Sequence, residues 1–95
     1  MKPYESKVAS YTGDGNAKVL SLGFNPSYFK LVNITDRIIE EKYSSMAAAD
    51  YLHTVAAGTN TNPADSAVTF PGDGTVSIAA GTNINAKVYH YLALY

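Results

Sequence analysis

The stretch GFNPSYFKLVNIT, residues 23–35, decides the fold. Asn25-Pro26 ends any strand before it, because proline has no N–H for a β-ladder and restricts the residue that precedes it. A second strand then runs over about 28–34, and alternate residues of this strand are apolar on both sides. The two sets are Phe29 with Leu31, and Val32 with Ile34. We expect one face to pack in the core, and the second sheet or a neighbouring subunit to cover the other.

Composition narrows the class of protein. The chain has 95 residues, which is the size of one domain, and 46% of them are hydrophobic, as in ordinary globular proteins. Only 16% are charged and the net charge is −1, so no basic surface is available for nucleic acid. Cysteine is absent, which excludes disulfides and thiolate chemistry. The apolar runs are too short for a membrane span, and no signal peptide is visible at the N-terminus.

Further strands flank the central stretch. Alternation predicts a strand over 17–24, a hairpin over 67–79 and a final strand over 87–95. The final strand has an aliphatic side and a tyrosine side. The aliphatic side carries Val88, His90, Leu92 and Leu94, and the other carries Tyr89, Tyr91, Ala93 and Tyr95. Residues 1–10 are polar and predict an N-terminal arm or a short edge strand before a single β domain over 11–95.

Residues 37–57 allow two interpretations. Their composition favours a helix, and Ile39, Tyr43 and Met46 form a helical stripe. Asp50 and His53 fall where that stripe would continue, which argues against a long helix. Sequence pattern alone leaves helix and strand open here.

No catalytic or metal-binding set emerges. The chain has two histidines, His53 and His90, and structural zinc requires four protein ligands. The Gly-Asp-Gly turns at Asp14 and Asp73 supply one carboxylate each, too few for calcium. The adjacent pair Glu40-Glu41 would point to opposite faces of a strand, so the two carboxylates cannot act on one bond. We therefore expect neither enzyme activity nor a metal or other cofactor.

The segment GFxPxxxxxxNxTD, Gly23 to Asp36, resembles a group of small bacteriophage virion structural proteins of the capsid decoration, or cement, kind. The resemblance extends over about residues 11–59, through Met46 and the segment VAAGT at 55–59. It implies a mostly β protein without catalytic residues. It also implies a strand over residues 37–43, and confines any helix to about Ser45–Leu52.

We therefore predict an all-β protein, a small β-sandwich or jelly-roll-like barrel of six to eight strands. The resemblance implies a homotrimer on the capsid surface of a virion, bound to the major capsid protein, with no nucleic acid or membrane partner. The expected subunit interface consists of Phe29, Val32, Ile34, Tyr89, Tyr91 and Tyr95. The alternative is a tail-fibre or capsid-fibre module that binds host surface glycan through the tyrosines and the Thr/Asn-rich loops 58–66 and 81–85.

Overall fold

The computed structural model describes residues 5–95 and confirms the all-β class. The strands are β1 (Ser6–Thr12), β2 (Lys18–Ser21), β3 (Tyr28–Asn33), β4 (Ile38–Tyr43), β5 (Leu52–Thr54), β6 (Asn60–Thr61), β7 (Val68–Thr69), β8 (Thr75–Ile78) and β9 (Val88–Leu94). One 3₁₀ turn, η1 (Ala80–Thr82), is the sole helical element of the described residues. The prediction was six to eight strands. The described residues form nine, and the two-residue strand β6 is too short to give an alternating pattern.

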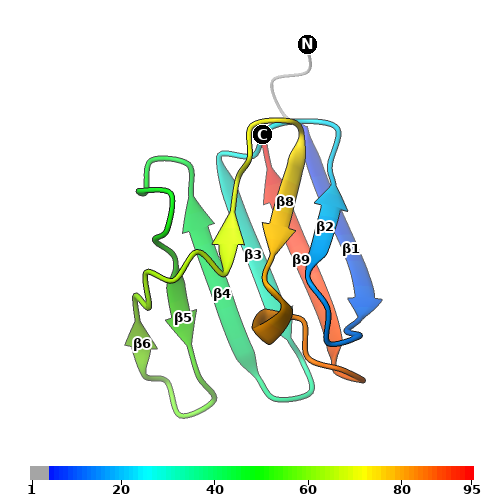
Figure 1. Ribbon diagram of the computed structural model, residues 1–95, viewed down its shortest axis with the longest axis vertical. Helices are drawn as coiled ribbons and strands as arrows, with labels where there is room; N and C mark the ends of the chain where they lie inside the picture. The colour runs from blue at the N-terminus through cyan, green and yellow to red at the C-terminus, as the bar shows by residue number, and fades with distance from the viewer. Residues whose placement is uncertain (1–4) are drawn as a thin grey trace.

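The strands form two antiparallel sheets packed as a sandwich (Figure 1). The large sheet has the order β1-β9-β3-β4-β5-β6, and the small sheet has the order β2-β8-β7. Figure 1 shows β2 and β8 in front of the half of the large sheet that contains β1, β9 and β3, whereas β5 and β6 lie beyond the small sheet. The small sheet therefore covers only part of one face of the large sheet.

The Asn-Pro corner takes the chain from one sheet to the other. Strand β2 of the small sheet ends at Ser21, and β3 of the large sheet begins at Tyr28. Between them, Asn25 accepts a hydrogen bond from the Gly74 N–H at 2.8 Å, which ties the corner to the β7–β8 turn. The Ser27 N–H donates to the Leu94 carbonyl at 2.7 Å, which fixes the register of β3 on β9. The stop at Asn25-Pro26 therefore marks a change of sheet.

The core lies between the two sheets. From the large sheet it takes the inward residues of β3 and β9, and from the small sheet the residues that face them. These are chiefly Phe29, Leu31, Tyr89, Tyr91 and Ala93 opposite Leu20, Val68, Val76 and Ile78. Leu22 and Phe24, which follow β2, are also buried. Val19 on β2 points the other way and is 61% exposed, as the alternation over 17–24 predicts.

The strand interpretation of residues 37–43 is confirmed by β4, but the helix expected near 45–52 is wrong. The reason is Lys42, which points inward from β4 and is only 2% exposed. Its ammonium donates to the carbonyl oxygens of Ala47 at 3.1 Å, Ala48 at 3.2 Å and Asp50 at 2.5 Å. In an α-helix these carbonyls would point along the axis toward N–H groups four residues on. The chain wraps around the buried cation instead.

The N-terminal segment belongs to the large sheet. Strand β1 pairs with β9 over its whole length, from Ser6 opposite Leu94 to Thr12 opposite Val88. Residues 6–10, for which the sequence predicted either an arm or a short edge strand, therefore form an edge strand. The β domain begins before residue 11. Residues 1–4 of the expected arm lie outside the described residues.

Candidate functional site

The outer face of the large sheet, which points away from the small sheet, is the candidate interaction surface. In an antiparallel pair, residues directly opposite each other share a face. The register places Val8, Leu92, Lys30, Glu41 and Leu52 in one row across this face. A second row contains Ser10, His90, Val32, Ile39 and Thr54, and a third contains Ser6, Leu94, Tyr28 and Tyr43. We call these three rows, together with Val88, the outer face.

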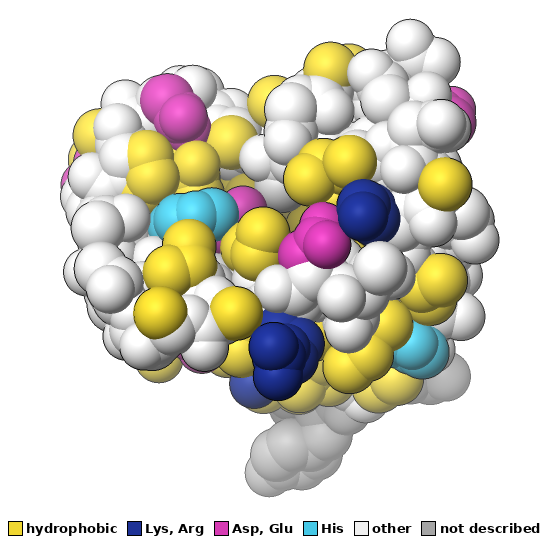
Figure 2. Space-filling view, turned by 90° about the horizontal axis from the view of Figure 1, so that it is seen from below, with side chains coloured by type: hydrophobic (Ala, Val, Ile, Leu, Met, Phe, Trp, Pro, Cys, Tyr) yellow, Lys and Arg dark blue, Asp and Glu magenta, His cyan; other side chains and the backbone are white. Residues whose placement is uncertain are grey.

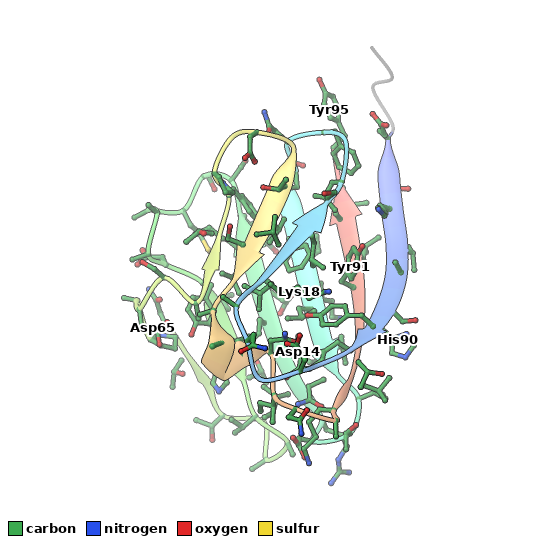
Figure 3. All side chains as sticks on the ribbon, turned by 45° about the vertical axis from the view of Figure 1, so that its right-hand side comes forward. Asp14, Lys18, Asp65, His90, Tyr91 and Tyr95 are labelled. Carbon is green, nitrogen blue, oxygen red and sulfur yellow. The ribbon has the colours of Figure 1, made fainter. Side chains whose placement is uncertain are left out.

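Most of the outer face is apolar, and no segment of residues 5–95 covers it. Val8 is 74% exposed, Tyr43 46%, Leu94 40% and Val88 39%. Figure 3 shows His90 directed away from the sandwich, whereas Tyr91, the next residue of β9, points between the sheets. Contiguous apolar surface of this kind commonly marks an interaction site.

Two oppositely charged side chains lie near the centre of the outer face. Lys30 on β3 and Glu41 on β4 are direct cross-strand neighbours, so their charges offset each other. The Tyr28 hydroxyl donates to the Glu41 carboxylate at 2.5 Å, and its ring lies against that of Tyr43 with centroids 5.1 Å apart. Burial and this bond to Glu41 raise the pKa of Tyr28 well above its ordinary value. The hydroxyl therefore remains a donor at neutral pH.

Three of the six residues predicted for the interface lie at the surface of the chain. Val32 is half-buried on the outer face, and Ile34, which follows β3 at the end of the sheet, is 54% exposed. Tyr95 is 37% exposed and its ring meets that of Phe24 edge-on at a centroid distance of 6.1 Å. Val32 and Ile34 thus lie on the side of β3 that points away from the core, the side for which we expected cover from a second sheet or a neighbouring subunit.

The other three, Phe29, Tyr89 and Tyr91, are corrected by the structure. They lie in the core of the single chain, with exposures of 0%, 2% and 7%. The tyrosine side of β9 faces inward because its polar tips find partners there: the Tyr89 hydroxyl accepts the Ile84 N–H at 2.9 Å. A neighbouring subunit cannot contact these rings without displacing the small sheet.

The sequence therefore identified both sides of β9, but the tyrosine side, which it placed at a subunit interface, faces the core of the chain. The side that faces outward carries Val88, His90, Leu92 and Leu94, and Val8 on β1 continues it to the edge of the sheet. The signal was present in the aliphatic alternation of residues 88–94. It was outweighed by the expectation that tyrosines mark an interface.

The two Thr/Asn-rich loops of the alternative interpretation meet in space. One cavity over the inner face of the large sheet is lined by Pro63 and Asp65 of the first loop and by Gly81, Thr82 and Ile84 of the second, together with Glu40 and His53. The cavity lies at the part of the large sheet that the small sheet does not cover. Sequence spacing could not have indicated it, because its walls come from six separate segments of the chain.

Comparisons of the chain with known protein families, with curated proteins and with solved structures found no match. Within residues 5–95, no helix is long and apolar enough to cross a membrane. The same residues contain no group of three or more His, Cys, Asp or Glu side chains placed to hold a metal ion.

Proposed function

We propose that the protein is a bacteriophage virion structural protein, a capsid decoration protein that acts as a homo-oligomer and stabilises the head by binding across capsomers. The single observation that carries the proposal is the open, apolar outer face of a sheet whose other face forms the core. The likeness of residues 23–36 to phage virion structural proteins supports the same conclusion.

A decoration protein needs contact surface rather than catalytic groups. A ligand that binds the mature shell but not its precursor stabilises that shell by mass action. Each copy contributes area, and a closed ring of copies at a three-fold lattice point binds several capsid subunits at once. We therefore propose a trimer on the capsid surface with the major capsid protein as partner.

The outer face suits contact between copies. Its aliphatic side chains supply buried area, and the central Lys30–Glu41 pair is close to neutral, so two copies meet without like-charge repulsion. Strand β1 adds an open edge, because no strand of the described residues pairs with its far side. Val8, 74% exposed at that edge, is the most exposed large apolar side chain of the described residues and lies where the face and edge meet.

The test compares two exposed valines on opposite sides of the sandwich. Val8→Asp places a charge on the outer face, and Val19→Asp, 61% exposed in β2, places the same charge outside the small sheet. Light scattering should give a trimer for the wild type and for Val19→Asp, and a monomer for Val8→Asp. Co-sedimentation with expanded capsids of the encoding phage should follow the same order.

The test can fail in two ways. A wild-type monomer that does not sediment with capsids would refute the decoration proposal. A Val8→Asp protein that is still trimeric, beside a Val19→Asp protein that is not, would move the interface to the small sheet.

The second candidate function is a fibre-type host-recognition module that binds surface glycan. What favours it is that loops 58–66 and 81–85 line one cavity with Glu40 and His53. Tyr89 and Tyr91 are buried, so of the three tyrosines of this interpretation only Tyr95 is partly exposed. A glycan array distinguishes the candidates: saturable binding by a chain that ignores capsids would favour recognition over decoration.

A further inference from the structure

The cavity over the uncovered part of the large sheet has the size of a ligand site. Its volume is about 350 Å³, within the usual range for small-molecule pockets of roughly 300–1,000 Å³. Figure 2 views the molecule from the end where the cavity opens, and the surface there is hollowed, with a histidine and acidic side chains beside apolar ones. The apolar part of the lining includes Leu31, Ile38, Pro63 and Ile84.

The first polar group of the cavity is a carboxylate–imidazole pair. Glu40 points inward from β4, is 4% exposed, and bonds through Oε1 to Nδ1 of His53 on β5. Its other oxygen, Oε2, has no hydrogen-bond partner among the described residues. When Nδ1–H donates to the carboxylate, Nε2 of the neutral imidazole is left as an acceptor. In that tautomer the pair offers acceptors to the cavity and no free donor.

The second polar group is Asp65 on the loop before β7, which Figure 3 labels. Its Oδ1 accepts the Tyr51 hydroxyl at 2.8 Å and the Ala67 N–H at 3.1 Å. Burial and the bond to Asp65 raise the pKa of Tyr51, so its hydroxyl stays protonated and directed at Asp65. The Oδ2 atom of Asp65 has no partner within residues 5–95, and it is a further open acceptor.

The cavity is electrostatically one-sided. Its lining, as far as the chain is described, contains two carboxylates and no lysine or arginine. Burial raises the pKa of Glu40, and the Asp65 carboxylate raises it further against the opposing effect of His53, which shows that the two acids influence each other. A cation placed between them would relieve this repulsion and use the open oxygens.

We propose that this cavity binds the ammonium or guanidinium group of a small organic cation, with the aliphatic stem of the ligand against Ile38 and Ile84. The cationic head lies between Glu40 and Asp65 and donates to their open oxygens. Two sources have this chemistry: a free alkylamine, and the lysine or arginine side chain of a neighbouring protein. This binding activity does not depend on the decoration function.

The test is an amide NMR titration of the full chain with butylammonium chloride, and with 1-butanol as the neutral ligand with the same stem. Butylammonium should shift the amides of β4, β5 and loops 63–67 and 79–84 in a saturable way, and 1-butanol should not. Asp65→Asn should weaken butylammonium binding about tenfold or more, because it removes a charge-assisted bond. Glu40→Gln should do the same where it folds.

The matched control is Asp73→Asn, which removes the same charge from the exposed turn before β8, at the opposite end of the sandwich from η1 (Figure 1). It should leave butylammonium binding unchanged. A peptide with a free lysine, compared with its Nε-acetylated form, separates the two sources: tighter binding of the unmodified peptide than of butylammonium assigns the site to a protein side chain.

Three results would overturn the proposal. One is equal binding of 1-butanol and butylammonium, which would make the site merely apolar. Another is tighter binding of a neutral sugar such as glucose, which would support the glycan candidate. The third is the absence of shifts with every probe while the spectrum shows a folded chain.

Discussion

The two faces of the large sheet are built from the same strands and similar residues, yet they have opposite roles. On β3, Leu31 is fully buried and points at the small sheet, while Val32 beside it points outward. On β4, the adjacent acids Glu40 and Glu41 separate in the same way: Glu40 is 4% exposed and Glu41 is half-buried on the outer face. Apolar content therefore does not distinguish the faces.

What distinguishes them is how deeply their polar groups are buried. Several inward polar side chains are buried and held by a specific neighbour: Lys42 by three backbone carbonyls, Glu40 by His53, and Asn33 by Asp36 at 3.1 Å. Burial of polar groups without such partners costs several kcal/mol, so these contacts are a condition of the inward orientation. The charged side chains of the outer face, Lys30 and Glu41, are only half-buried, so this face can contact a partner without breaking such buried contacts.

The largest expected contrast is between two leucines on neighbouring strands. Leu31→Ala on the inner face should lower the free energy of unfolding by about 2–5 kcal/mol, because it removes buried apolar contacts and enlarges a cavity. Leu92→Ala on the outer face should cost the monomer about 1 kcal/mol or less. Urea unfolding, at protein concentrations where light scattering finds monomer, measures both. Equal losses would mean that the outer face is also a core.

The second contrast uses two lysines on opposite faces. Lys42→Met removes the cation that holds three carbonyls of residues 47–50, and should cost about 1.5–3 kcal/mol. Burial lowers the pKa of Lys42, with Asp50 opposing, so its charge depends on these contacts. Lys30→Met on the outer face is the control and should cost little. We expect faster amide hydrogen exchange over residues 46–51 in Lys42→Met and not in Lys30→Met. Unchanged exchange of these amides in Lys42→Met would contradict the prediction.

These contrasts also show how far the sequence predicts the molecule. The corner at Asn25-Pro26 and the strands near 28–34 and 88–94 could be predicted, because they depend on local chemistry and alternation. The strand over 37–43 was implied only by the resemblance, because the sequence pattern left helix and strand open there. The inward side of β9 could not be predicted. Both of its sides carry apolar residues, and the choice depends on partners for the Tyr89 hydroxyl that only the folded chain brings to it, the Ile84 N–H and the Asn33 amide.

The same limit applies to the loop over 44–51 and to the cavity. Helix propensity of the alanines over 47–49 is overridden by one buried lysine on the preceding strand, which no local rule includes. The cavity needs Glu40, His53, Asp65 and residues 79–84, which become neighbours only when the loops close over the uncovered part of the sheet. The deep burial of Glu40 could not be predicted either, because the sequence does not indicate which of the adjacent pair Glu40 and Glu41 points inward.

The smallest expected contrast separates those two adjacent glutamates by pH. Burial raises the pKa of Glu40, so the folded chain binds its proton more tightly than the unfolded chain. The stabilisation from this proton is complete below the unfolded pKa and is lost as the pH rises through the folded pKa. Stability of the wild type relative to Glu40→Gln should therefore fall as pH rises over that interval, in urea midpoints measured on both proteins. Glu41→Gln, which removes a carboxyl from the outer face of the same strand, controls for net charge. The prediction would be contradicted if the stability difference between the wild type and Glu40→Gln did not change with pH. It would also be contradicted if Glu41→Gln gave the same pH dependence.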